Sequence, residues 1–254
     1  MPDVTALYDT LGQGYSAHRR PDPRIAALIE DALGDARSVV NVGAGAGSYE
    51  PRGRALLAVE PSSVMIAQRA AGAAPVVKAS AMRLPFPDGA FDAALAILTV
   101  HHWPDRAQGL RELRRVARRR VVLLTSDTSR LRFWLLDYFP GILDLDARSM
   151  PRLEELEAAL GPCQVREVPV PHDCCDGFLG AWWRRPHAYL DPGVRGAISV
   201  FAQLPDVPSG VEALARDLAS GAWNDRYGEL LQRESLDVGY RLVRADTGSP
   251  RPGS

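Results

Sequence analysis

The stretch VVNVGAGAGSYEP, residues 39–51, indicates what kind of ligand this chain is built to hold. A short and largely β-branched run leads into it, and glycines follow at Gly43, Gly45 and Gly47. β-Branched residues favour strands, whereas glycine lacks the Cβ that would hold a ligand away from the backbone. The stretch therefore predicts a buried strand that ends in a loop whose N–H groups approach a ligand closely.

Helical and strand patterns alternate through the first half of the chain. The segment 91–100, FDAALAILTV, is apolar throughout, as expected for a strand in a parallel sheet covered on both faces. Successive β-then-α units favour an open parallel sheet with right-handed crossovers. We therefore expect an α/β fold, a Rossmann-like, open and mostly parallel seven-stranded sheet with helices on both faces. The expected strands are 38–42, 55–59, 76–77, 91–100 and 120–125, and the expected helices are 22–33, 61–71 and 105–117.

The second half follows a different pattern. A helix is expected at 153–160, an alternating strand at 164–170 and a last strand at 238–243, with helical patterns, prolines and tryptophans between the last two. We therefore expect a helical insertion before the last strand, where it would form a lid or a substrate pocket. The expected division is 1–35 for N-terminal lid helices, 36–170 for the Rossmann-like core, 171–237 for the helical insertion, 238–246 for the final core strand and 247–254 for a disordered tail.

The composition of the 254 residues is that of an ordinary globular protein, with 46% hydrophobic and 24% charged residues. The formal net charge of −1 provides no overall field for nucleic acid or for an anionic membrane. No apolar run reaches the length of a membrane span, and the N-terminus lacks the pattern of a signal peptide. The three cysteines include no CxxC pair, which argues against a disulfide framework or a metal site. We expect a cytoplasmic protein.

An acidic residue closes the second expected strand. Glu60 lies seventeen positions after Gly43, where its carboxylate can accept two hydrogen bonds from a ribose diol at the carboxyl end of a parallel sheet. We therefore expect the ligand to be a nucleoside. The six residues from Gly43, GAGAGS, depart from the dinucleotide pattern GxGxxG or GxGxxA, because Ser48 occupies the sixth place.

The spacing GxGxG and three further segments carry a family resemblance. The segments are AVEPSSVMIAQRA (58–70), KASAMRLPFPDGAFDAAL (78–95) and LTVHHWPD (98–105). In order and at these distances, they resemble the class I S-adenosylmethionine (SAM)-dependent methyltransferases, closest to the small-molecule and ubiquinone-type group, over roughly residues 8–128. The resemblance implies that S-adenosyl-L-methionine donates a methyl group to a small-molecule acceptor and leaves as S-adenosyl-L-homocysteine (SAH).

The resemblance also implies which residues surround the cofactor. Glu60 would bind the ribose, Met65 would lie near the adenosine, and residues 80–82 would surround the adenine. The end of the fourth strand would lie beside the methionine part and the methyl group. The full expected set is Tyr15, Arg20, Asn41, Gly43, Ala44, Gly45, Glu60, Pro61, Met65, Ser80, Ala81, Met82 and Thr99.

Some of these positions differ from the family pattern or allow an alternative. Asn41 stands where the family usually has an acid, so it keeps a hydrogen bond and loses a charge. Ser80 likewise replaces an acid that often contacts adenine. By the resemblance, Tyr15 and Arg20 would contact SAM, the arginine through the carboxylate of the cofactor, with Arg19 as the alternative.

Histidines follow the fourth expected strand and recur in the insertion. His101 or His102 would act as a general base near neutral pH, or would hydrogen-bond backbone groups without a catalytic part. Because neighbours on a strand point to opposite sides, at most one of the two would face the pocket. In the insertion, His172 or Asp173 would deprotonate an acceptor; alternatively, the tryptophans nearby form the small core of a lid.

Other functions remain open from sequence alone. A protein of this fold can bind SAM without methyl transfer, as a decarboxylase, a cyclase or a regulator. Less expected are an NAD-dependent oxidoreductase and an interaction module without nucleoside binding. N-, O-, C- and S-methylation are all compatible with the pattern. Nucleic acid is not expected as the substrate, because the basic run 114–120 decorates a helix end and has no interleaved aromatic residues.

Overall fold

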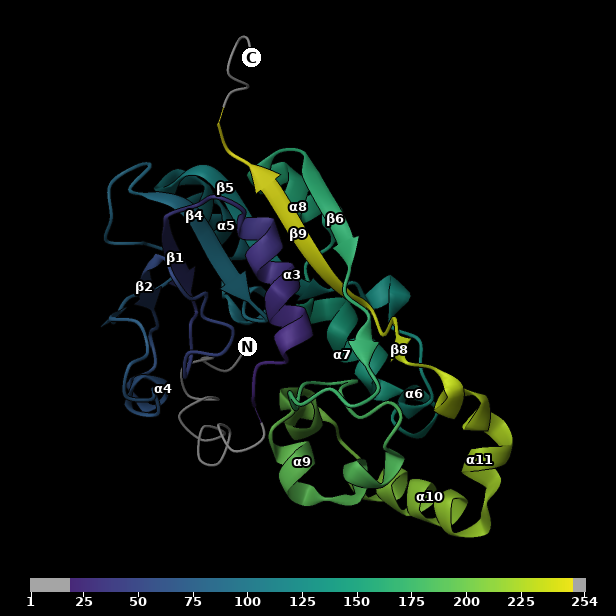
Figure 1. Cartoon of the computed structure of the whole chain (residues 1–254). Coiled ribbons are helices and arrows are strands. Elements are labelled where there is room, and N and C mark those ends of the chain that lie inside the picture. Colours follow the sequence, from purple (N-terminus) through teal and green to yellow (C-terminus); the bar gives the residue numbers. More distant parts are fainter. Residues whose placement is uncertain (1–18, 249–254) are drawn as a thin grey trace.

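The computed structural model describes residues 19–248, so Tyr15 and the expected tail residues 249–254 lie outside the described part of the chain. Its centre is a seven-stranded sheet in the order β3-β2-β1-β4-β5-β9-β6 (Figure 1). The pairs among β1 to β5 are parallel, and β9 is antiparallel to both of its neighbours. The expected open, mostly parallel sheet is confirmed. The strands are β1 Ser38–Val42, β2 Ala55–Val59, β3 Val76–Val77, β4 Phe91–Ile97, β5 Ala117–Ser126, β6 Cys163–Glu167 and β9 Tyr240–Asp246.

Helices cover both faces of the sheet. Along β4, Ala93 and Leu95 belong to the core that includes α3, whereas Ala94 and Ala96 belong to the core that includes α5 and α8. This alternation follows from the two-residue period of a strand. Each buried Leu, Ile or Val in these cores contributes roughly 1.5–3 kcal/mol, so both faces stabilise the sheet that carries the site. The helices are α3 Pro23–Leu33, α5 Arg106–Val116 and α8 Leu153–Leu160.

Local signals start and end the helices. The Asp22 side chain accepts a hydrogen bond from the Arg24 N–H at 3.0 Å, which satisfies a donor that α3 leaves free at its start. Gly34 ends α3 with a φ of +52°, as its position after the last apolar residue predicts. The helix after β2 is shorter than expected, because α4 covers only Ser63–Ala67.

The fourth strand is also shorter than expected. β4 ends at Ile97, Leu98 has a φ of +50°, and Val100–His102 forms a 3₁₀ helix, η1. A branched side chain at positive φ is strained, and such positions gather at ligand sites. The prediction of a strand through residue 100 is therefore wrong at its end, and the opposite-side argument for the two histidines does not apply.

Two separate segments build what we call the helical lobe, α6 and α7 together with residues 171–237. Most of the segment 171–237, residues 172–234, lies between β7 and β8, which pair antiparallel. α6 and α7 follow β5 and were not predicted; in Figure 1 they lie with α9 to α11 beyond one end of the sheet. The bounds are β7 Val170–Pro171, β8 Ser235–Leu236, α6 Leu135–Tyr138, α7 Gly141–Ser149, α9 Pro192–Gly196, α10 Val207–Ser220, α11 Ala222–Tyr227, η2 Thr128–Arg130, η3 Pro186–Leu190, η4 Ser199–Gln203 and η5 Gly228–Gln232.

The helical lobe has an aromatic core of its own. The Trp134 ring meets Tyr189 and Trp223 edge-on, at centroid distances of 5.5 and 5.4 Å. Its indole N–H donates to the Trp183 carbonyl at 2.6 Å, which ties α6 to the segment after β7. Aromatic pairs of this kind contribute about 0.5–1.5 kcal/mol beyond the area that they bury. Trp223 therefore packs in a lid core, the alternative that was left open for this region, whereas Trp183 belongs to the core that includes α3.

Candidate active site

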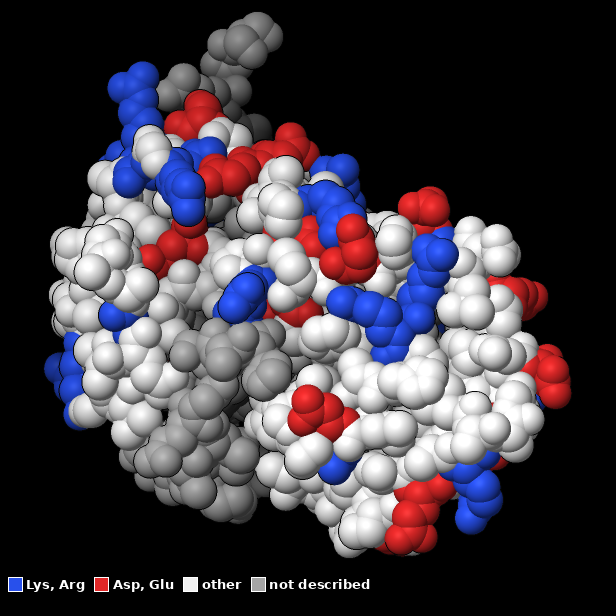
Figure 2. Space-filling model, turned by 60° about the horizontal axis from the view of Figure 1, so that its bottom comes forward, with Lys and Arg blue, Asp and Glu red and all other residues white. Residues whose placement is uncertain are grey.

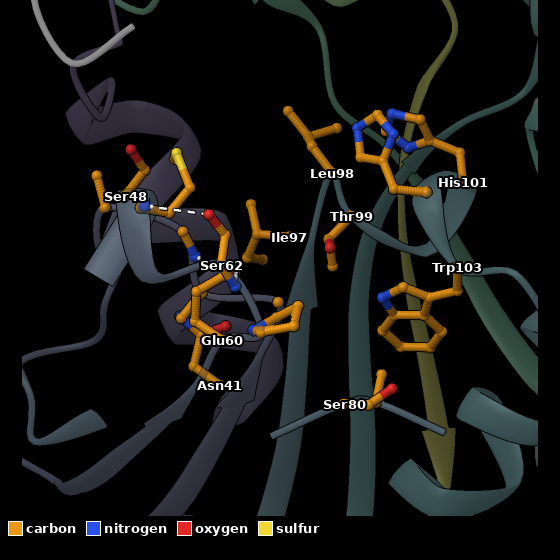
Figure 3. A pocket seen from close by; sticks show the side chains of 18 of the residues that line it. Asn41, Ser48, Glu60, Ser62, Ser80, Ile97, Leu98, Thr99, His101 and Trp103 are labelled. Carbon is orange, nitrogen blue, oxygen red and sulfur yellow. Dashed lines mark hydrogen bonds between the residues drawn. The ribbon is translucent and has the colours of Figure 1, made fainter. Parts of the chain in front are cut away.

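A cavity of about 610 Å³ opens at the carboxyl ends of β1, β2 and β4. Loops after these strands, η1 and Arg19 form its wall (Figure 3). Its size is typical of small-molecule sites, and parallel sheets bind ligands at this end. The expected cofactor residues on this wall are Asn41, Gly43, Ala44, Gly45, Glu60, Pro61, Met65, Ser80, Ala81, Met82 and Thr99.

The glycine loop after β1 is bonded to the end of β2. Gly43 and Ala44 donate their N–H groups to the Val59 carbonyl at 2.8 and 3.1 Å. Gly43 has a φ of +70°, and a Cβ there would overlap the Thr99 side chain. Only glycine meets both conditions, so the close approach of the loop to the end of β4 depends on this residue.

Glu60 is buried at the edge of the cavity, with 6% of its surface exposed. Its Oε2 accepts from the Gly45 N–H at 2.8 Å, and its Oε1 accepts from the Ser62 N–H at 2.9 Å. Burial raises the pKa of this carboxyl, and the two backbone donors oppose the increase. A carboxylate has about four acceptor positions, so each oxygen keeps one for a ligand hydroxyl.

Asn41 lies in β1 below the glycine loop, and only 1% of it is exposed. Its Oδ1 has no hydrogen-bond partner among the described residues. Leaving a buried acceptor unpaired costs about 1–3 kcal/mol, so this oxygen is a local cost to the stability of β1 beside the cavity. Figure 3 shows Asn41, Glu60 and Ser62 together on one side of the cavity, across from Trp103 and His101.

Both histidines of η1 line the cavity. Their ring centroids lie 3.8 Å apart, so the two rings are in contact at this wall. Burial, and then the positive charge of Arg19, lowers the pKa of His102 to about 4. Burial, His102 and the nearby arginines lower the pKa of His101 well below its usual value. Both rings are therefore neutral near pH 7, and both are weak bases.

Of the two N-terminal arginines considered for the cofactor, Arg19, which was the alternative, lies on the cavity wall, and Arg20 does not. The Arg19 Nε donates to Asp176 Oδ1 at 2.7 Å, and both side chains are almost fully buried. Asp176 belongs to the segment between β7 and α9, so this ion pair joins the cavity wall to the helical lobe. Arg20 is exposed and does not line the cavity.

The structure does not bring His172 and Asp173 to the cavity. His172 Nε2 lies 3.4 Å from Glu234 Oε2. Asp173 pairs with Arg24 at 2.7 Å, and 59% of its side chain is exposed. His172 therefore takes part in a contact within the lobe, and Asp173 in a surface contact between the lobe and α3. Neither residue lines the cavity.

Several wall residues were missed by sequence reasoning, among them Arg106 and Ser149. The Arg106 Nη1 donates to the Ser149 carbonyl at 3.2 Å, so α5 and α7 meet at the cavity. One sequence signal could have indicated this side. Gly109 lies inside α5, where glycine is unfavourable by about 1 kcal/mol. A Cβ there would overlap the Trp103 ring, so the glycine makes room for that side chain.

The described residues contain no group of three or more His, Cys, Asp or Glu that could hold a metal ion. Cys163, Cys174 and Cys175 are free thiols. Among the described helices, none has the length and apolar character needed to cross a membrane.

Comparison with known proteins agrees with this geometry. A family model described as a methyltransferase domain matches residues 40–125, the segment with the glycine loop, Glu60 and η1. A crystal structure from Anabaena variabilis, described provisionally as a methyltransferase from an antibiotic biosynthesis pathway, is 34% identical. It has a TM-score of 0.83 and covers 90% of this chain and 98% of its own. The chain belongs to the class I SAM-dependent methyltransferases.

Other similar proteins differ in what they are described to do. The 2-methyl-6-phytyl-1,4-hydroquinone methyltransferase of a Synechocystis strain is 28% identical over 167 residues, 58% of this chain. That match spans half the length of the curated relative, 50%. The structure of the cyclase SpnF is 17% identical with a TM-score of 0.51, covering 97% of this chain and 93% of its own, and shares the fold.

Proposed function

We propose that this protein transfers a methyl group from SAM to a small-molecule acceptor. The observation that carries the proposal is the buried Glu60 carboxylate, which the Gly45 and Ser62 N–H groups hold at the cavity edge. A carboxylate in this place binds a ribose diol. Because Gly43 has no side chain, the loop backbone lies open to the adenosyl part of SAM. The chain's own residues therefore fit the cofactor of its family.

Other wall residues suit the remaining parts of SAM. Met65 and residues 80–82 offer an uncharged surface to the adenine. Asn41 lines the cavity and offers its amide group to the amino-acid part of SAM. Arg19 offers a guanidinium to the carboxylate.

SAM supplies an electrophilic methyl group, so the protein contributes mainly alignment and exclusion of water. Orientation alone lowers a barrier of this kind by about 7–11 kcal/mol at most. Leu98 and Trp103 add apolar surface to the cavity, and His101 and His102 add neutral polar surface. Because both histidines are weak bases, we assign them to packing and hydrogen bonding of the acceptor, and not to proton removal.

We further propose that the helical lobe selects the acceptor, and that residues 171–237 act as a substrate unit on a core formed by residues 36–170 and 238–246. The lobe meets the cavity through Ser149 and through the Arg19–Asp176 ion pair. The acceptor of the Synechocystis relative is, by its name, a hydroquinone. A small, largely apolar molecule with a hydroxyl group is the acceptor class that this lobe suits best.

The charge distribution supports a small-molecule substrate in the cytoplasm over a nucleic acid. On the face in Figure 2, Lys and Arg are interspersed with Asp and Glu, and the part formed by the helical lobe is mostly uncharged. Binding of nucleic acid depends on positive charge gathered in a stripe or patch. The net charge of −1 agrees with this reading.

The direct test is incubation of the purified protein with methyl-labelled SAM and a small-molecule extract that contains hydroquinones. We expect label in an organic-soluble product and release of SAH. The sharing of this fold with a cyclase supplies the competing function. SAM binding without any labelled product would favour that alternative, and stabilisation by NAD alone would favour an oxidoreductase.

A further inference from the structure

Arg69 is a buried arginine that the proposed function has not used. It follows α4, and only 5% of its side chain is exposed. Its guanidinium forms an ion pair with Glu50, whose side chain is 11% exposed. Desolvation offsets much of the attraction within a buried ion pair. The pair therefore matters mainly for the positions that it fixes.

The Arg69 guanidinium holds the glycine loop at Gly45. Its Nη1 donates to the Gly45 carbonyl at 3.1 Å, and its Nη2 donates to Glu50 and to the Ala74 carbonyl. The planar fork of an arginine fixes direction as well as distance. Gly45 has a φ of +52°, and glycine loses more conformational freedom on folding than any other residue. A fixed donor on its carbonyl therefore restrains the loop where the backbone is most free.

Gly45 connects this restraint to Glu60. Arg69 binds the Gly45 carbonyl, and the Gly45 N–H donates to Glu60 Oε2 at 2.8 Å. Both Gly45 and Glu60 line the cavity, whereas Arg69 does not. Burial raises the pKa of Glu60, and the positive charge of Arg69 is among the causes that oppose the increase. Arg69 therefore acts on the carboxylate from outside the cavity.

The third glycine of the loop lies against the same ion pair. A Cβ at Gly47 would be 3.4 Å from Arg69 Nη1 and 3.4 Å from the Glu50 carboxylate, so the pair packs directly on this residue. The second oxygen of Glu50 accepts from the Ala74 N–H at 3.0 Å. The glycine loop, Arg69 and the segment before β3 are thus joined by one set of charge-assisted hydrogen bonds.

We propose that Arg69 is a positioning residue for the cofactor: it holds the Gly45 carbonyl so that the N–H of the same glycine keeps the Glu60 carboxylate in its ribose-binding position. Glu50 anchors the guanidinium from the end of the loop. This role rests on the proposed function, in which Glu60 binds the ribose of SAM. The second backbone donor to Glu60, the Ser62 N–H, does not depend on Arg69.

The first test needs no ligand and compares the two amides that donate to this carboxylate. In the free protein, amide hydrogen exchange measured by NMR should become about tenfold faster at Gly45 in Arg69→Met, because the loop is no longer held there. Exchange at Ser62 should change by less than about twofold, since its bond goes to Glu60 Oε1. Unchanged exchange at Gly45, or equal acceleration at both amides, would overturn the proposal.

A matched control and a second variant complete this test. Arg54 also pairs with a glutamate, Glu30, at 2.9 Å and donates to a backbone carbonyl, but it does not line the cavity. Arg54→Met should therefore leave both amides unchanged, and the same acceleration there would overturn the proposal. If Arg69→Met does not fold, Glu50→Gln decides the question by removing the anchor. Exchange at Gly45 should then become about threefold faster, and no change would overturn the proposal.

The second test measures SAH binding by calorimetry and separates this role from the proposed function. Arg69→Met should weaken binding about tenfold in the wild-type background but less than about threefold in Glu60→Gln, because Arg69 acts through that carboxylate. An equal loss in both backgrounds would contradict the positioning role. Failure of the wild-type protein to bind SAH would instead remove the proposed function, whereas a selective effect on the Gly45 amide would still show that Arg69 holds the loop.

Discussion

The two sides of the cavity are built in different ways. On the cofactor side, the backbone itself forms the wall, and Gly43 and Glu60 are held by short N–H bonds at the ends of β1 and β2. On the helical-lobe side, side chains form both the core and the wall, with Trp134, Trp223 and Tyr189 packed edge to face. Backbone geometry restricts the residue types that fit, whereas an aromatic core accepts many arrangements.

This difference explains what the sequence could predict. Positive φ and the overlap with Thr99 require glycine at position 43. The loop can therefore be recognised in the sequence by the spacing of its glycines. Parallel sheets bind ligands at the carboxyl ends of their strands, so Glu60, which follows the second strand, is expected at the site. Apolar runs such as 91–100 predict the parallel sheet itself. This wall of the cavity was therefore predictable almost residue by residue, and the contacts of these residues with the cofactor stay a prediction.

The opposite side was not predictable for a physical reason. η1 arises because Leu98 turns to positive φ, which nothing in its residue type indicates, and this turn brings both His101 and His102 to the cavity. α7 brings Ser149 to the cavity through packing with segments far away in the chain. His172 and Asp173 looked catalytic by type alone, and tertiary packing left them elsewhere.

The largest expected effect is on the lobe core. Trp223→Ala removes a ring that is 1% exposed and should lower the free energy of unfolding by about 3–5 kcal/mol. Urea denaturation followed by circular dichroism measures it. Trp223→Phe is the control, because it keeps an aromatic ring and removes an indole N–H that has no partner among the described residues. If the two variants lose equal stability, edge-on packing is not what holds the lobe.

The next effect is on the backbone wall. Gly43→Ala should weaken SAH binding at least 100-fold, about 2.7 kcal/mol, because the new Cβ overlaps Thr99 in a residue at φ +70°. Gly53→Ala has nearly the same φ, +71°, and open space around it, so it should bind SAH as the wild-type protein does. Calorimetric titration of both compares overlap with backbone strain alone. Equal losses of SAH affinity in the two variants would mean that backbone strain, and not the overlap with Thr99, weakens binding.

A smaller effect concerns the start of the sheet. Asp92 is buried, yet its pKa falls to about 2 because the Arg37 and Ser38 N–H groups and Arg118 outweigh burial. The folded-state pKa lies below the usual 3.8, so this stabilisation is present above about pH 4 and is lost as pH falls through 2. Asp92→Asn should cost about 1–2 kcal/mol at pH 7, toward the lower value because Arg118 is half exposed. Urea melts should show the gap to wild type closing between pH 4 and 2; a constant gap would contradict this assignment.

The smallest effect is expected at the surface contacts of the lobe. Asp173→Asn and His172→Ala should leave the Kd for SAH and the transfer rate unchanged, because neither residue lines the cavity. The measurement is steady-state turnover of both variants beside wild type. A loss of kcat in either variant, with stability retained, would show that the residue takes part in catalysis.

The most direct test of the central claim is isothermal calorimetry of SAH with wild-type protein, Glu60→Gln and Glu154→Gln. Glu154 is exposed and outside the cavity, so it controls for loss of one carboxylate. We predict that wild type and Glu154→Gln bind alike, and that Glu60→Gln binds about 100-fold more weakly, a change of about 2.7 kcal/mol. Equal heat and affinity in Glu60→Gln, for protein shown to be folded, would contradict the assignment of the ribose to this carboxylate.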